Sequence, residues 1–150
     1  MEILPYTKER IQDVLRFEQD LRKEEDSWGW EIDDRYVEAV TRSFSAPGFE
    51  SSISLLAYQD GKVVGRIDSG MIHSHFDGSV KAYLDWICVL KSYRHRGAAQ
   101  ALMDALRKEL KALGVDTLIG LIDAQEGAQR FYRSMENAMI RDEGIWIDIL

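Results

Sequence analysis

A turn of basic and small residues lies between an apolar segment and a segment with helical periodicity. Its residues are Arg94, His95, Arg96, Gly97, Ala98, Ala99 and Gln100. Small side chains let a ligand approach the backbone, and the first N–H groups of a helix lack intrahelical partners and carry the positive end of its dipole. The pattern therefore predicts a phosphate-binding site, and a plain solvated turn is the alternative.

Two segments of the chain resemble the signatures of one family. Arg94, Gly97 and Ala99 match Arg/Gln-x-x-Gly-x-Gly/Ala, which is similar to the acetyl-CoA-binding signature of the GNAT superfamily of N-acetyltransferases. The segment 125–137 resembles the family's second signature, Asn-x-x-Ala-x-x-Phe-Tyr-x-x-x-Gly-Phe. It retains Ala128, Phe131 and Tyr132, with Gln125 in place of Asn and Glu136-Asn137 in place of Gly-Phe.

This resemblance implies an N-acetyltransferase that uses acetyl-CoA as co-substrate and acts by direct attack of a primary amine in a ternary complex. It implies that a strand amide near the thioester faces the acetyl carbonyl and that Tyr132 donates a proton to the leaving sulfur. The implied acetyl-CoA-binding residues are Ile87, Cys88, Val89, Arg94, His95, Arg96, Gly97, Ala98, Ala99, Gln100, Gln125 and Ala128.

Asp85 is the predicted general base. An amine with a lysine-like pKa of about 10.4 is almost wholly protonated at neutral pH, so a proton must leave it before or during attack. A two-residue period places Tyr83, Asp85 and Ile87 on one strand face and Leu84, Trp86 and Cys88 on the other. An acid within an apolar strand is costly unless it is used or paired. A water molecule as the base, or a buried Asp85 satisfied by backbone N–H groups, is the alternative.

An acidic and aromatic stretch follows the first predicted helix and is predicted to bind the acceptor. The predicted acceptor-binding residues are Glu24, Asp26, Trp28, Trp30 and Tyr83. Carboxylates attract a cation and aromatic faces can line its pocket, which favours a small cationic amine such as a polyamine or an aminosugar. A solvated acidic loop with core aromatics is the alternative for these residues. A peptide or protein N-acetyltransferase, or a coenzyme-A-binding regulatory module with little catalysis, is the alternative function.

Apolar patterns along the chain predict alternating strands and helices. Strands are predicted at 3–4, 52–58, 63–72, 83–89 and 115–122, with two short strands within 138–150. Helices are predicted from an N-cap at Thr7 to about residue 23 and at 33–44, 97–113 and 126–135. Asp60-Gly61 closes a hairpin. The predicted class is α/β (α+β), a GNAT-like mixed and mostly antiparallel central sheet of six or seven strands with helices on both faces.

Length and charge limit the remaining classes of function. The 150 residues suit one domain, and the formal net charge of −7 argues against a nucleic-acid-binding surface. No apolar run approaches the ~20 residues that span a bilayer, and the N-terminus lacks a secretory pattern, so a cytoplasmic protein without membrane partners is predicted. His73 and His75 lack a third ligand, so no metal is predicted. The resemblance leaves a homodimer open.

Overall fold

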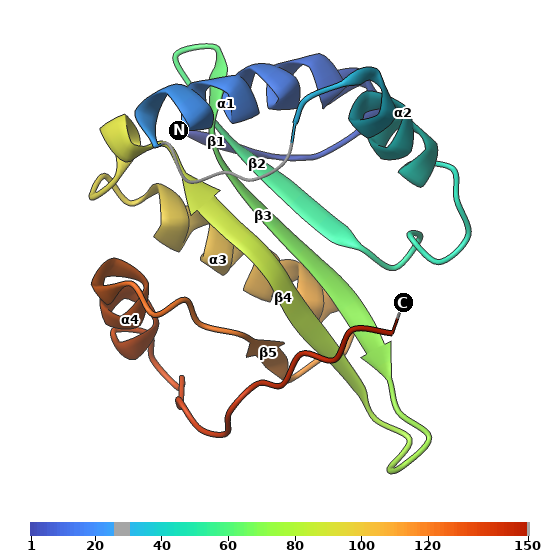
Figure 1. Cartoon of the computed structure of the whole chain (residues 1–150). Helices are drawn as coiled ribbons and strands as arrows, with labels where there is room; N and C mark the ends of the chain where they lie inside the picture. The colour runs from blue at the N-terminus through green and yellow to red at the C-terminus, as the bar shows by residue number, and fades with distance from the viewer. Residues whose placement is uncertain (26–30, 150) are drawn as a thin grey trace. The chain divides into compact units, whose positions relative to one another are not determined.

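A sheet of five strands forms the centre of the protein in the computed structural model, which describes residues 1–25 and 31–149. The strands follow one another across the sheet in chain order (Figure 1). They are β1 (Glu2–Pro5), β2 (Ile53–Gln59), β3 (Lys62–His73), β4 (Val80–Val89) and β5 (Leu118–Gly120). The first three neighbouring pairs are antiparallel, while β5 joins β4 after a helical crossover, which makes the sheet mixed.

The β2–β3 hairpin is confirmed. Asp60 has φ 52° and Gly61 has φ 77°, the two left-handed residues that a tight hairpin turn requires. The turn and a β-bulge between Ala57 and Tyr58 together set the register in which Leu55 faces Ile67 and Ser54 faces Asp68. That register matters for function, because it brings polar side chains of β2 and β3 to one face of the sheet.

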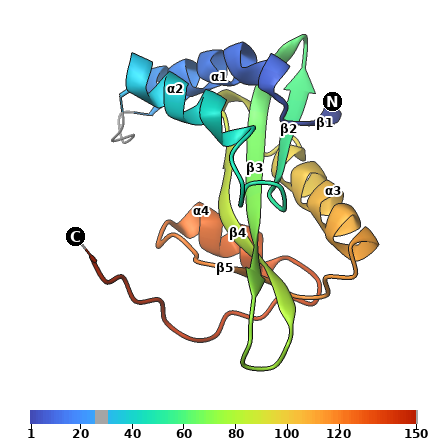
Figure 2. The ribbon, with the colours of Figure 1, turned by 90° about the vertical axis from the view of Figure 1, so that its right-hand side faces the viewer.

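The described residues form four α-helices. They are α1 (Ile11–Glu24), α2 (Asp34–Ser43), α3 (Ala98–Ala112) and α4 (Glu126–Arg133). A Cβ on Gly65 would lie 3.1 Å from Leu102 Cδ1, so α3 packs closely against that face of β3. The next residue of β3, Arg66, contacts Glu18 of α1 on the opposite face. The predicted helices on both faces are therefore present, as Figure 2 shows for α2 and α3.

The core consists of the apolar faces of α1 and α3 against the sheet. Phe17 and Leu21 of α1 are 1% exposed, and Leu102 and Leu106 of α3 are fully buried. Each such side chain contributes about 1.5–3 kcal/mol of transfer free energy.

The predicted six or seven strands are wrong, because the sheet has five. Residues 138–149 were expected to form two strands but contain none. Ile145, Ile147 and Ile149 alternate as in a strand yet are 81%, 70% and 86% exposed. Alternation favours a strand only where a neighbouring backbone completes its hydrogen bonds, and the described residues provide none for this segment.

Two compact units make up the chain, Met1–Ile119 and Gly120–Leu150. The first contains α1, α2, α3 and strands β1 to β4, and the second contains α4. None of the helices in residues 1–25 and 31–149 has both the length and the apolar character that crossing a bilayer requires.

Candidate active site

The predicted phosphate-binding turn joins β4 to α3 through two residues with left-handed backbone. After β4, Lys91–Tyr93 form a short 3-10 helix, His95 has φ 60° and Gly97 has φ 85°. Gly97 precedes the first residue of α3, and the Ala101 N–H donates to its carbonyl at 2.9 Å. The N–H groups before Ala101 therefore have no carbonyl one turn earlier in α3, and a helix N-terminus of this kind can bind an anion.

The N-terminus of α3 lacks an acidic residue in its first turn. By contrast, the first turns of α1, α2 and α4 contain Asp13, Asp34 and Glu126. An acidic side chain at this position offsets the positive end of a helix dipole. The positive end of α3 is left without such an offset, which is the electrostatic condition for holding an external phosphate.

Arg94 and Glu24 both stabilise the turn through ion-pair or hydrogen-bond contacts. Arg94 Nη1 lies 2.6 Å from Glu25 Oε1, and its Nε donates to the Val89 carbonyl at 3.1 Å. Glu24 accepts hydrogen bonds from Ser92 N at 3.1 Å and from Ser92 Oγ at 2.6 Å. The structure thus places Glu24, a predicted acceptor-binding residue, against the turn with both carboxylate oxygens occupied. His95, Arg96 and Gln100 are exposed.

A cleft of about 860 Å³ opens on the α1 and α2 side of the sheet. Tyr6, which follows β1, lines it together with residues of α1, α2, the loop after α2 and strands β2 to β4. Its charged residues are Glu18, Glu50, Arg66, Asp68 and Asp85. Of the predicted acceptor-binding residues, Tyr83 lines the cleft, while Asp26, Trp28 and Trp30 lie outside the described residues.

A β-bulge in β4 places Asp85 in this cleft. Asp68 pairs with Trp86 and Ser69 with Leu84, so Asp85 is the extra residue between two paired positions. The bulge breaks the two-residue period, and Tyr83, Asp85 and Trp86 all line the cleft. The predicted separation of Trp86 from Tyr83 and Asp85 is therefore wrong. Asp85 is exposed, which removes the alternative of a buried carboxylate satisfied by the backbone.

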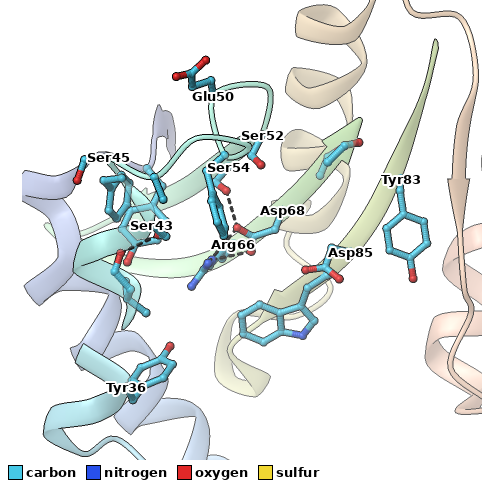
Figure 3. Close-up of a pocket in the computed structure, with 18 of the residues that line it drawn as sticks. Tyr36, Ser43, Ser45, Glu50, Ser52, Ser54, Arg66, Asp68, Tyr83 and Asp85 are labelled. Atoms are coloured by element: carbon cyan, nitrogen blue, oxygen red, sulfur yellow. Dashed lines mark hydrogen bonds and ion pairs between the residues drawn. The ribbon is translucent and has the colours of Figure 1, made fainter. Parts of the chain in front are cut away.

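A buried ionic network forms the floor of the cleft (Figure 3). Arg66 Nη2 donates to Asp68 Oδ1 at 3.0 Å, and Arg66 Nε lies 2.6 Å from Asp68 Oδ2 as an ion pair. Ser54 Oγ donates to Asp68 Oδ1 at 2.6 Å, and Tyr36 OH donates to Glu18 Oε1 at 2.6 Å. The Arg66 guanidinium also lies 4.7 Å from the centre of the Tyr6 ring.

Sequence reasoning missed Glu18, Arg66 and Asp68. The available signals were charges within apolar patterns: Arg66 and Asp68 interrupt the apolar β3 strand, and Glu18 stands beside Phe17 on the buried face of α1. A charge in such a position needs a partner. The sequence does not reveal that α1 and β3 supply partners to each other.

A comparison with protein families identifies the fold's relatives. The model of the acetyltransferase (GNAT) family matches residues 3–136. The chain belongs to the GNAT family. The predictions of this family and of an N-acetyltransferase are therefore confirmed. A search of curated proteins finds no match.

Solved GNAT acetyltransferases share the fold over nearly the whole chain. An aminoglycoside acetyltransferase, meta-AAC0020, from an uncultured soil metagenomic sample has a TM-score of 0.82 at 15% identity, covering 99% of this chain and 96% of that chain. Ribosomal-protein-alanine N-acetyltransferase from Brucella melitensis biovar Abortus 2308 has a TM-score of 0.74 at 17% identity, covering 100% of both. AAC(6')-Iy, in complex with the bisubstrate analog CoA-S-monomethyl-acetylneamine, has a TM-score of 0.77 at 20% identity, covering 98% of this chain and 96% of that chain. At these identities the similarities show the fold.

The second GNAT signature forms α4 and its N-cap in the second unit of the chain. Gln125 is the N-cap residue, and Ala128, Phe131 and Tyr132 lie within the helix. The Tyr132 ring packs edge-to-face on Phe131 with the ring centres 5.3 Å apart. Burial raises the pKa of Tyr132 above its ordinary value. A phenol with a raised pKa stays protonated at neutral pH, as a proton donor must.

Burial also alters the acids of the first unit. It raises the pKa of Cys88 to about 11, so this thiol is protonated and unreactive at neutral pH. Burial raises the pKa of Glu18, and this outweighs the hydrogen bond from Tyr36 and the charge of Arg66. Within the described residues, no three His, Cys, Asp or Glu side chains gather as metal ligands.

Proposed function

We propose that this GNAT protein transfers the acetyl group of acetyl-CoA to the primary amine of a small cationic acceptor. The observation that supports the proposal most directly is that β4 connects an acidic cleft to a turn at the positive N-terminus of α3. Tyr83, Asp85 and Trp86 of β4 line an acidic cleft, and the chain leaves Val89 directly into the turn at the uncompensated N-terminus of α3. A polyanionic donor and a cationic acceptor thus each have a complementary surface beside the same strand.

In the proposed binding mode, the turn holds the pyrophosphate of acetyl-CoA with backbone N–H groups from Gly97 to Gln100. Arg96 adds positive charge and His95 adds an imidazole ring, and both side chains are exposed to a ligand. Arg94 is engaged with Glu25 and Val89, so its contribution is to hold the shape of the turn. The backbone of residues 87–89 then lies along the reactive end of the cofactor, where an amide N–H can stabilise the developing oxyanion.

In the proposed reaction, the neutral amine nitrogen attacks the thioester carbonyl carbon, and the carbon–sulfur bond breaks as the amide forms. Asp85 receives the proton of the attacking amine, directly or through water, because it is exposed at the β4 bulge within the cleft. Tyr132 gives its proton to the departing sulfur. Both roles need groups that reach the reacting atoms in the ternary complex.

The first test measures thiol release from acetyl-CoA with polyamines, aminosugars, amino acids and short peptides. We expect transfer to small cationic amines, and Tyr132→Phe should lower kcat at least about tenfold with little change in acetyl-CoA affinity, as expected for loss of a proton donor. Tyr58→Phe is the matched control, because the Tyr58 hydroxyl donates to Asp13 at 2.7 Å, away from the cleft and the turn. A pH–rate profile unchanged by Asp85→Asn would remove Asp85 as the base.

The same assay separates an enzyme from a binding module. The departure at Glu136-Asn137 from the family's Gly-Phe favours the second possibility. Acetyl-CoA binding without transfer to any amine, together with no effect of Tyr132→Phe, would support a coenzyme-A-binding module and contradict the proposal.

We also propose that residues 1–150 act as one acetyltransferase domain. The family match runs from residue 3 to residue 136 and so includes parts of both compact units. If Met1–Ile119 alone bound acetyl-CoA and turned over as fast as the full chain, this proposal would fail.

A further inference from the structure

The cleft contains more negative than positive charge. Four carboxylates line it, from Glu18, Glu50, Asp68 and Asp85, together with one guanidinium, that of Arg66. Arg66 is already engaged, because it pairs with Asp68 and lies 3.4 Å from Glu18 Oε1 through Nη1. Among the described lining residues, no cation is therefore left to repel a positively charged acceptor or to bind an anionic one.

Glu18 holds the charge that the network does not neutralise. Its side chain is 1% exposed, its Oε1 accepts from Tyr36 OH, and its Oε2 is buried without a hydrogen-bond partner. Glu18 and Asp68 share one guanidinium, so ionisation of both leaves one negative charge at the floor of the cleft. Such a charge is costly in the empty protein and favourable when a ligand brings an opposite charge nearby.

The groups around Glu18 come from every element packed on it. Tyr6 follows β1, Tyr36 belongs to α2, and Arg66 and Asp68 belong to β3. On its own helix, Arg22 donates to the Glu18 backbone carbonyl at 3.0 Å and does not line the cleft. Burial opposes the ionised form of Glu18, while the hydrogen bond from Tyr36 and the charges of Arg66 and Arg22 support it. A second cation inside the cleft would tip this balance towards the ionised form.

Three hydroxyl groups in the cleft already donate their protons within the protein and offer a ligand only their lone pairs. Ser54 donates its proton to Asp68 at 2.6 Å, and Ser43 donates to the Val40 carbonyl at 2.7 Å. Tyr36 likewise donates to Glu18. The oxygen atoms of these groups retain acceptor capacity. The surface thus suits a ligand rich in donors, such as an ammonium group, better than a ligand rich in acceptors.

We infer that Glu18 is a specificity-determining residue that makes the cleft prefer an acceptor with a second ammonium group beside the one that is acetylated. This inference rests on the proposed function, because it concerns the acceptor of that reaction. Glu18 acts through its field rather than by contact, since Oε2 is enclosed. Charge interactions through the protein interior are stronger and less screened than those at the surface.

The test compares butylamine with putrescine, which has the same carbon chain and a second amine. Calorimetry on the full chain saturated with coenzyme A measures both dissociation constants in wild type, Glu18→Gln, Tyr36→Phe and Glu50→Gln. We expect wild type to prefer putrescine and Glu18→Gln to reduce that preference at least about tenfold. Gln retains an acceptor oxygen for Tyr36 and Arg66 while removing the charge, and a thermal unfolding midpoint confirms that each variant is folded.

The controls separate charge from structure. Tyr36→Phe removes the hydrogen bond that favours the ionised form of Glu18, so the putrescine preference should fall, but by less than in Glu18→Gln. Glu50 is exposed, so any effect of Glu50→Gln should disappear at high salt. The wild-type preference itself should persist at high salt, a result that needs no variant. Loss of the wild-type preference at high salt, or its retention in Glu18→Gln, would each overturn the inference.

Binding and turnover distinguish this inference from the proposed function. If putrescine binds in a Glu18-dependent way and no amine is acetylated, the proposed function fails and the role of Glu18 in recognition stands. If amines are acetylated and Glu18→Gln leaves the preference unchanged, the proposed function stands and the inference fails.

Discussion

The turn before α3 and the cleft beside α1 and α2 are built in opposite ways. The turn consists of consecutive residues, is mostly exposed, and depends on backbone conformation at His95 and Gly97. The cleft floor consists of Glu18, Arg66 and Asp68, which are distant in sequence and depend on one another's charges. The first site is positive and local, and the second is acidic and assembled by tertiary packing.

This difference predicts how each site fails. A backbone-built site tolerates loss of an exposed side chain but not of the conformation that orients its N–H groups. A site built from buried charges tolerates few side-chain substitutions, because removing one charged partner leaves the other buried charge unpaired. The same substitution should therefore have unequal effects at the two sites.

The largest expected effect is on stability at the cleft. Arg66→Met should lower the free energy of unfolding by about 3–5 kcal/mol, because it leaves Glu18 and Asp68 buried without their shared cation. Arg96→Met at the turn is the matched control, since Arg96 is exposed and stacks over the Tyr93 ring at 5.3 Å. We expect that variant to lose less than about 1 kcal/mol. Urea denaturation of both variants measures the contrast, and equal losses would contradict it.

A smaller effect separates binding from stability at the turn. Gly97→Val forces a β-branched residue to φ 85°, which costs about 1–2 kcal/mol, and should weaken acetyl-CoA binding about tenfold or more by disturbing the N–H groups. Gly114→Val imposes a similar strain, at φ 75°, beyond the other end of α3. Neither added Cβ meets another atom within 4 Å. Calorimetry should find normal acetyl-CoA affinity in the Gly114 variant; a matching loss there would assign the effect to the helix as a whole.

The smallest effect is the pH dependence of the cleft. Because burial raises the folded-state pKa of Glu18 above its ordinary 4.5, the folded protein holds this proton at pH values where the unfolded chain has released it. Stability from Glu18 should therefore fall as pH rises from the unfolded to the folded pKa. We expect wild type to lose stability relative to Glu18→Gln across that interval in a urea series. If the stability of wild type relative to Glu18→Gln stayed constant or increased with pH, the pKa of Glu18 would not be raised in the folded protein.

Local patterns predicted most of the first unit. The alternation in β2 and β3 with Asp60-Gly61 between them, and the apolar face of α3 beginning at Gly97, each depend on neighbouring residues alone. The final strands were predicted from the same kind of alternation and are absent, since a strand also needs an edge to pair with. The β4 bulge at Asp85 has no local signal, because it depends on the register with β3.

The candidate site divides along the same line. Residues close together in the chain predicted the family, the turn between β4 and α3 as a candidate phosphate site, and a short helix that contains Tyr132, because neighbouring residues set each of these features. Tertiary structure decided that Glu24 braces the turn, that Asp85 and Trp86 share a cleft, and that Glu18 lies beneath it. Those outcomes depend on which distant side chains meet, and the partner that neutralises a buried charge is selected by packing, which no spacing along the chain encodes.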